Sequence, residues 1–255
     1  MRDPKIAAVL ALFATALLSS CTDPLPSIAF SLSDPGAFAF VCLQQQGNEV
    51  VPADPADCDG TNSSFRLTAF VANGPAGDIS IMDLTSGDPV DTDPMIPGHT
   101  GLYIGGYPQD IVAAPDSTAL YVLDPVETGI VTIDPITLEF SRFPIPYSGA
   151  RMTFLAEGPA LLVTLPGKGA LLRVALGADG LPIEVELHEI GGTPFSLEPI
   201  LNADGLPFVA VGHQEQHYLS LVDGTAMTEV WRVGLLQPCR DGLDNDDDGL
   251  LDRDD

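Results

Sequence analysis

The residues best suited to chemistry lie near the carboxyl end of the chain, where acids recur at regular spacing. The last residues read CRDGLDNDDDGLLDRDD. Calcium prefers six to eight hard oxygen ligands, and carboxylates at positions 1, 3 and 5 of a tight loop, with glycine at position 6, supply such a set. We expect a Ca²⁺ loop in which Gly249 makes the turn. Its expected ligands are the side chains of Asp244, Asp246, Asp248, Asp252 and Asp255 and the carbonyl of Leu250. The alternative is a solvated acidic tail without fixed structure.

The amino terminus has the pattern of an export signal. An apolar run over residues 6–18 follows a basic start and is too short to span about 30 Å of hydrocarbon comfortably. The segment LSSC at residues 18–21 resembles the lipobox of bacterial lipoproteins, which are cut before an acylated cysteine. The resemblance implies a signal peptide over residues 1–20 and lipidation of Cys21. Thr22 in place of Asp favours the outer membrane or cell surface. An ordinary secretion signal with a chance cysteine is the alternative.

The charge balance restricts the partners. The 255 residues include 36 acids and 10 Lys and Arg, a formal net charge of −26. Nucleic acid and anionic membrane surfaces are poor partners for that charge. We therefore expect membrane contact through the lipid anchor alone, and an unknown protein or glycan as ligand.

Disulfides persist in exported proteins, so the remaining cysteines are informative. Cys42 and Cys58 flank a polar stretch, and a bridge between them is the expected pairing. Cys239 is then left without a partner in this sequence.

A repeated strand, turn, strand pattern organises the middle of the chain. Apolar or β-branched runs flank short polar turns, which is typical of hairpins. Four such segments start at residues 70, 121, 162 and 208, about 40 to 50 residues apart. They are Phe70–Asp83, Tyr121–Asp134, Leu162–Ala175 and Phe208–Asp223. Another short strand precedes three of them and a further one follows two, so each unit has about four strands.

The unit from Tyr107 to Glu139 resembles the YVTN-type blade of bacterial surface and lactonase-like β-propellers. The resemblance implies an all-β fold of about four to five recognisable four-stranded blades, in a closed or an incomplete ring. Strands at 38–43 and 48–51 are candidates for a partial fifth blade. A β-sandwich is the rival fold. The expected divisions are 1–20 signal peptide, 21–66 linker and partial blade, 67–238 blades, and 239–255 calcium motif.

The acidic carboxyl-terminal segment resembles the calcium loops of thrombospondin type 3 repeats and dockerins. In related chains a second cysteine commonly follows the loop, whereas Cys239 has none after it. Together with the low number of blades, this predicts that the sequence is part of a longer chain.

Other candidate sites are weaker. His213, Glu215 and His217 alternate and could share one face of a strand as a zinc site, but we expect an exposed polar turn. Asp110, Arg151 and Glu198 could open onto a central channel, although the sequence does not place them at matching positions. Hydrolase motifs such as G-x-S-x-G and H-E-x-x-H are absent from the sequence.

The sequence therefore favours a lipid-anchored extracytoplasmic propeller that acts as a binding or scaffolding module with a calcium-ordered end. A second hypothesis is a lactonase-like hydrolase or a quinoprotein-like enzyme of the cell envelope. A third is an envelope structural protein that docks through the calcium motif.

Overall fold

The chain builds β-sheets. The computed structural model describes residues 35–93, 95–96, 98–155, 159–201 and 207–234. Within these ranges the regular structure is strand, apart from two single-turn 3₁₀ helices, η1 (Pro55–Asp57) and η2 (Pro166–Lys168). No helix of the described residues is both long enough and apolar enough to cross a bilayer. The carboxyl-terminal calcium motif, Cys21 and Cys239 all lie outside the described residues.

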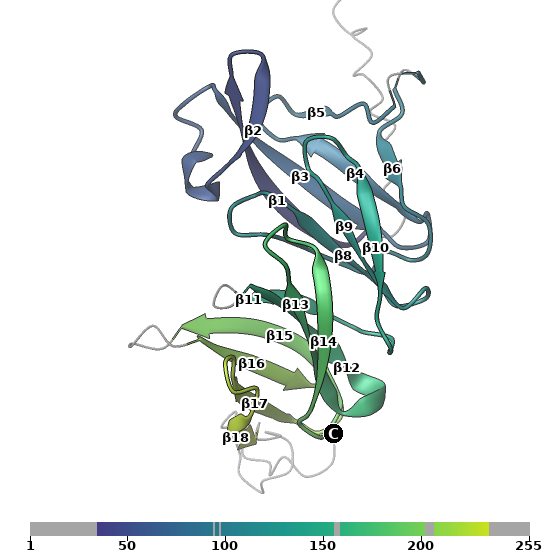
Figure 1. The fold of residues 1–255 in the computed structure, drawn as a ribbon, viewed down its shortest axis with the longest axis vertical. Helices are drawn as coiled ribbons and strands as arrows, with labels where there is room; N and C mark the ends of the chain where they lie inside the picture. Colours follow the sequence, from purple (N-terminus) through teal and green to yellow (C-terminus); the bar gives the residue numbers. More distant parts are fainter. Residues whose placement is uncertain (1–34, 94, 97, 156–158, 202–206, 235–255) are drawn as a thin grey trace, which may run out of the picture. The chain divides into compact units, whose positions relative to one another are not determined.

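Eighteen strands form four antiparallel sheets, which follow one another along the chain (Figure 1). The first sheet has the order β2-β1-β3-β4-β5, with β6 also paired to β4. Its strands are β1 (Pro35–Gln46), β2 (Glu49–Ala53), β3 (Phe65–Asn73), β4 (Asp78–Asp83), β5 (Asp88–Pro89) and β6 (Gly101–Tyr103). The second sheet contains β7 (Asp110–Ala113), β8 (Leu120–Asp124), β9 (Gly129–Ile133) and β10 (Phe140–Pro144). The third contains β11 (Met152–Leu155), β12 (Ala160–Leu165), β13 (Ala170–Leu176) and β14 (Pro182–Glu189). The fourth contains β15 (Pro194–Leu201), β16 (Pro207–His213), β17 (Tyr218–Asp223) and β18 (Glu229–Gly234).

The four expected hairpins form the middle of the four sheets. They are β3–β4, β8–β9, β12–β13 and β16–β17. In the second to fourth sheets the preceding strand pairs with the first hairpin strand, and the following strand pairs with the second. The expectation of four-stranded units is therefore confirmed for the second to fourth sheets, whereas the first sheet has six strands. The sheets of the described residues do not close into a ring.

The amino-terminal strands correct one expectation. β1 pairs with β3 over most of its length, and β2 pairs with β1, so both strands belong to the first sheet. They do not start a partial fifth blade. The expected division between residues 66 and 67 falls inside β3. β1 is the strand that precedes the first hairpin and pairs with it. The sequence indicated such a preceding strand only for the second, third and fourth hairpins.

Alternation along each central strand divides the core between neighbouring sheets. On β8, Leu120 and Val122 pack into the cluster shared with the first sheet, whereas Tyr121 and Leu123 pack into the cluster shared with the third. All four side chains are essentially buried. A third cluster joins the third and fourth sheets through residues such as Leu162 and Val211. Strands buried on both faces thus explain the nearly continuous apolar runs of the sequence.

Two of the connections between sheets have the same local sequence and structure. Residues 104–108 read IGGYP and residues 190–194 read IGGTP. In the first, the amides of Ile104 and Gly105 donate to the carbonyl of Gly77; in the second, the amides of Ile190 and Gly191 donate to that of Gly169. All four glycines of the two segments have positive φ, which favours glycine. We call these segments the IGG crossings.

Candidate ligand-binding site

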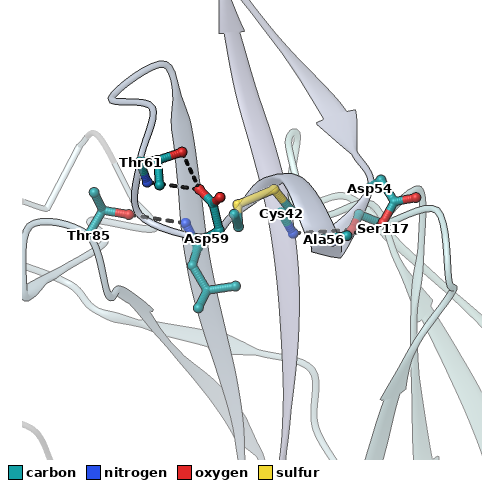
Figure 2. The surroundings of a disulfide bond; sticks show 9 residues. Cys42, Asp54, Ala56, Asp59, Thr61, Thr85 and Ser117 are labelled. Carbon is teal, nitrogen blue, oxygen red and sulfur yellow. Dashed lines mark hydrogen bonds between the residues drawn. A yellow bond between two sulfur atoms is a disulfide. The ribbon is translucent and has the colours of Figure 1, made fainter.

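A disulfide closes the loop that follows β2. Cys42, in the middle of β1, is bonded to Cys58, just after η1, with 5.8 Å between their Cα atoms (Figure 2). This is the pairing expected from the sequence. Asp54 caps η1 by accepting a hydrogen bond from the amide of Ala56 at 2.9 Å. The amide of Cys42 donates to the buried hydroxyl of Ser117 at 3.1 Å, which connects β1 to the second sheet. The loop is therefore anchored covalently and by hydrogen bonds.

An open pocket of about 600 Å³ lies beside this disulfide. It is lined by Cys58, Asp59, Gly60, Thr61, Asn62, Ser63, Phe65, Leu67, Leu84 and Thr85. We call it the disulfide pocket. Its volume falls in the range of small-molecule sites, which is about 300 to 1,000 Å³.

Local hydrogen bonds set the polar rim of the disulfide pocket. The carboxylate of Asp59 accepts from the amide of Thr61 at 2.8 Å and from its hydroxyl at 2.6 Å, as Figure 2 shows. The hydrogen bond from the Thr61 hydroxyl is the main reason why the pKa of Asp59 lies below its usual value. Asn62 accepts in the same manner from the amide and hydroxyl of Ser64. Short polar side chains that bond the backbone two residues ahead are typical of ordered turns.

The wall of the pocket is apolar. Phe65 and Leu67 are half-buried on β3, and Leu84 follows β4 with 41% of its surface exposed. The amide of Leu67 donates to the hydroxyl of Thr85 at 3.1 Å, which ties the wall to the rim. The disulfide pocket thus has a rim of hydroxyl, amide and carboxylate groups beside an apolar wall. Such a pocket can bind a ligand that has polar groups at its edge and an apolar face.

The structure separates the three residues considered for zinc. Glu215 and His217 lie in the exposed β16–β17 turn, as expected, but His213 ends β16 and is only 8% exposed. Its Nε2 lies 2.9 Å from the hydroxyl of Ser220, which donates to Glu229 at 2.7 Å. Arg232 then binds Glu229 through two hydrogen bonds of 2.6 Å. Turn propensity alone could not place His213 in the core of the fourth sheet.

The electrostatics of this His213 network favour a neutral imidazole. Burial lowers the pKa of His213, and the nearby guanidinium of Arg232 lowers it further. The hydrogen bond from Arg232 keeps the pKa of Glu229 below its usual value. Ser220 is 1% exposed and lies between the imidazole and the carboxylate. In a nucleophilic triad the histidine is between the other two groups, so this network is a structural one.

Asp110 begins β7 and Arg151 directly precedes β11, and the two lie opposite equivalent positions of β8 and β12, contrary to expectation. Asp110 pairs with Leu123, the residue before the end of β8, and Arg151 hydrogen-bonds Thr164, the residue before the end of β12. The carboxylate of Asp110 accepts from the amide of Met152 at 2.7 Å, and burial raises the pKa of Asp110. Asp110 thus joins two sheets.

Arg151 and Glu198 differ in their surroundings. The guanidinium of Arg151 lies 5.9 Å from the ring centre of Phe195. Glu198 is exposed and pairs with Ala210, three rungs from the end of β16, so it does not match the other two. Among the described residues there is no group of three or more His, Cys, Asp or Glu side chains that could hold a metal ion.

Two arginines that the sequence did not single out reach the IGG crossings. Arg142 on β10 donates to the carbonyl of Ile104 at 3.0 Å, and Arg232 on β18 donates to that of Ile190 at 3.3 Å. Arg142 also binds the buried carboxylate of Asp124 at 2.8 Å. The recurrence of I-G-G-x-P was the available sequence signal for these contacts.

Comparison with solved structures supports the fold. Kuenenia stuttgartiensis hydrazine synthase is similar over 79% of this chain and 49% of its own, with 13% identity and a TM-score of 0.55. The Dos1 propeller is similar over the same shares, with 11% identity and a TM-score of 0.51. A chain of the nidogen/laminin complex is similar over 78% of this chain and 80% of its own, with 13% identity and a TM-score of 0.51.

The chain spans about half the length of the first two of these structures. No family model matches the sequence, and no curated protein matches it. Identities this low carry information on fold alone. The chain has an all-β fold of the β-propeller type. Its four consecutive antiparallel sheets, which share apolar clusters, agree with these similar structures.

Proposed function

We propose that this protein is a lipid-anchored, extracytoplasmic β-propeller that acts as a binding or scaffolding module, with the disulfide pocket as its ligand site. Acylation at Cys21 would hold it at the outer membrane or cell surface. The Cys42–Cys58 bond supports an oxidising location, because such bonds persist outside the cytosol. The disulfide pocket itself is the observation that carries the proposal.

The lining of the disulfide pocket favours an uncharged polar ligand, and a glycan matches it well. A sugar presents hydroxyls at its edge and C–H groups on its face, which complement the polar rim and the wall of Phe65 and Leu84. Ionised Asp59 and the net charge of −26 disfavour an anionic ligand. The loop is held in place before binding, so ordering it would cost little on association.

Titration calorimetry of the full chain with neutral hexasaccharides tests this proposal. We expect saturable binding of at least one of cellohexaose, maltohexaose and chitohexaose. Replacing Ser63→Ala and Leu84→Ala together should weaken it at least tenfold. A matched control is Ser148→Ala with Leu181→Ala, because Leu84 is 41% and Leu181 is 39% exposed. Absence of binding for all three sugars, or equal weakening in the control, would refute the glycan site.

The proposal includes calcium at the acidic carboxyl-terminal segment. Extracellular calcium modules often bind with dissociation constants of about 10⁻⁴ to 10⁻³ M, so millimolar concentrations are needed. We expect heat of binding at millimolar Ca²⁺ that is lost when Asp244→Ala and Asp248→Ala are combined. The pair Asp88→Ala and Asp91→Ala removes the same charge elsewhere and should leave the heat unchanged. No difference between the two double variants would remove calcium from the proposal.

A further inference from the structure

A second cavity lies between the second and third sheets, away from the disulfide pocket. Its volume is about 320 Å³. It is lined by Thr118, Ala119, Thr132, Ile133, Asp134, Glu139, Phe140, Ser141, Asp179 and Leu181. These residues come from the turn before β8, from the β9–β10 hairpin and from the β13–β14 turn. We call it the acidic cavity.

Three carboxylates of the cavity have unused hydrogen-bonding capacity. Asp134 accepts from the amides of Ile136 and Thr137 through Oδ1, and Asp179 accepts from the amide of Leu181, also through Oδ1. The Oδ2 atoms of both, and the whole carboxylate of Glu139, have no hydrogen bond or ion pair to another described residue. No described cation therefore neutralises them.

Thr132 provides an independent indication of a ligand. Thr132 is one of the residues that line the cavity, and it is 7% exposed. Its buried hydroxyl has no hydrogen-bond partner among the described residues. Buried polar groups without a partner are uncommon and need an explanation. A ligand that donates hydrogen bonds into the cavity would supply the missing partner.

The cavity is formed before any ligand binds. The hydroxyl of Tyr121 donates to the carbonyl of Gly180 at 2.8 Å, which holds the β13–β14 turn of the third sheet against the second. Burial, and then the nearby carboxylates of Asp116 and Asp179, raise the pKa of Tyr121 to about 12. The negative charge of this region therefore acts on the buried hydroxyl of Tyr121.

The remaining wall is apolar. Ala119 and Ile133 are buried, whereas Phe140 and Leu181 are 45% and 39% exposed. An alkyl stem can pack on such a wall while its charged end reaches the carboxylates. An aromatic ring such as that of Phe140 also attracts cations.

We propose that the acidic cavity binds a basic side chain, lysine or arginine, of a polypeptide partner. The ammonium or guanidinium group lies among Asp134, Glu139 and Asp179, and the stem packs against Phe140 and Leu181. The proposal is independent of the disulfide pocket and of the glycan assigned to it.

Nuclear magnetic resonance of the labelled full chain tests it. The probe is the pentapeptide Gly-Gly-Lys-Gly-Gly, compared with the same peptide carrying norleucine, which keeps the stem and removes the charge. We expect saturable shifts of the amides of Thr118, Thr132, Ser141 and Leu181 with the lysine peptide. The norleucine peptide should bind at least fivefold more weakly.

A matched pair of variants separates this site from general attraction to an acidic protein. Glu139→Gln with Asp179→Asn should raise the dissociation constant at least fivefold. Glu49→Gln with Asp88→Asn makes the same charge change at exposed positions outside the cavity and should raise it less than twofold. Shifts spread evenly over the acidic surface, or equal effects of the two pairs, would overturn the proposal.

Discussion

At the scale of single residues, a few buried charges are stabilised by partners on other strands. Asp124 has a fully buried side chain and accepts from three backbone amides and from Arg142. Burial alone would raise the pKa of Asp124, but these hydrogen bonds and the charge of Arg142 bring it below the usual value. Its ionised form therefore stabilises the fold above about pH 4, and this contribution is lost as the pH falls through the lowered pKa.

Removal of Arg142 should be costly. Arg142→Leu leaves the carboxylate of Asp124 buried without its cation, and we expect a loss of about 3 kcal/mol in the free energy of unfolding. Glu127→Gln is the control, because Glu127 also binds Arg142, at 3.2 Å, but its side chain is 49% exposed. It should cost less than about 1 kcal/mol. Urea denaturation measures both, and equal losses would show that the burial of Asp124 is unimportant.

His213 makes stability depend on pH in a different range. Its pKa is lowered in the folded protein, so the unfolded chain takes up a proton at this site first as the pH falls below about 6.5. Stability should decrease with falling pH, by at most about 1.4 kcal/mol per pH unit from this group. In His213→Gln this part of the slope should disappear when melting is followed between pH 7.5 and 5. Parallel pH curves for the two proteins would contradict the assignment.

At the scale of elements, the last residue of the first strand in each hairpin is a repeated position in the four sheets. Asn73, Asp124, Leu165 and His213 each end such a strand, and all are buried. Their different side chains are matched by different neighbours. Asn73 donates to Asp78 and Ser80, whereas His213 bonds Ser220. One backbone position thus holds an apolar, an acidic, an amide or an imidazole side chain, and each polar one makes at least one hydrogen bond.

The IGG crossings should be sensitive to added side-chain atoms. Gly192 and Gly87 both have positive φ, 63° and 79°. A Cβ on Gly192 would lie 2.6 Å from Nδ1 of His213 and would clash with the Tyr218 hydroxyl, whereas a Cβ on Gly87 meets nothing within 4 Å. Gly87→Ala should cost about 1 kcal/mol through backbone strain, and Gly192→Ala about 1 to 3 kcal/mol more. Equal melting temperatures of the two variants would contradict this role of the crossing.

At the scale of the whole molecule, the first and fourth sheets each have an exposed apolar face. On the first sheet Phe38 is 65% and Phe40 is 45% exposed, and their rings are 5.3 Å apart. On the fourth, Trp231 is 63% exposed and Leu219 is 39% exposed. These faces contrast with the second and third sheets, whose central strands are buried on both sides. Exposed apolar patches of this kind favour binding of apolar molecules.

The face of the first sheet should bind an apolar dye. Nile red is uncharged, so the net charge of −26 does not repel it. We expect its fluorescence with the protein to fall at least twofold when Phe38→Ser and Phe40→Ser are combined. Val126→Ser is the control, because Val126 is 69% exposed at a separate position. Unchanged fluorescence in the double variant would show that this face is covered in solution.

Local sequence patterns were enough to predict the four hairpins, most of the strands beside them and the Cys42–Cys58 pairing. These depend on local properties: alternation of apolar residues, turn residues between them, and two cysteines 16 positions apart. Local patterns missed the role of β1 in the first sheet, because a single strand does not indicate which neighbour it will pair with.

Which polar groups are buried, and what they contact, depends on how the sheets pack in the folded protein. Asp110 meets Met152 and Cys42 meets Ser117 across separations of 42 and 75 residues. The acidic cavity likewise joins turns of two sheets. No local pattern specifies such contacts, because the packing of one sheet on the next brings them together.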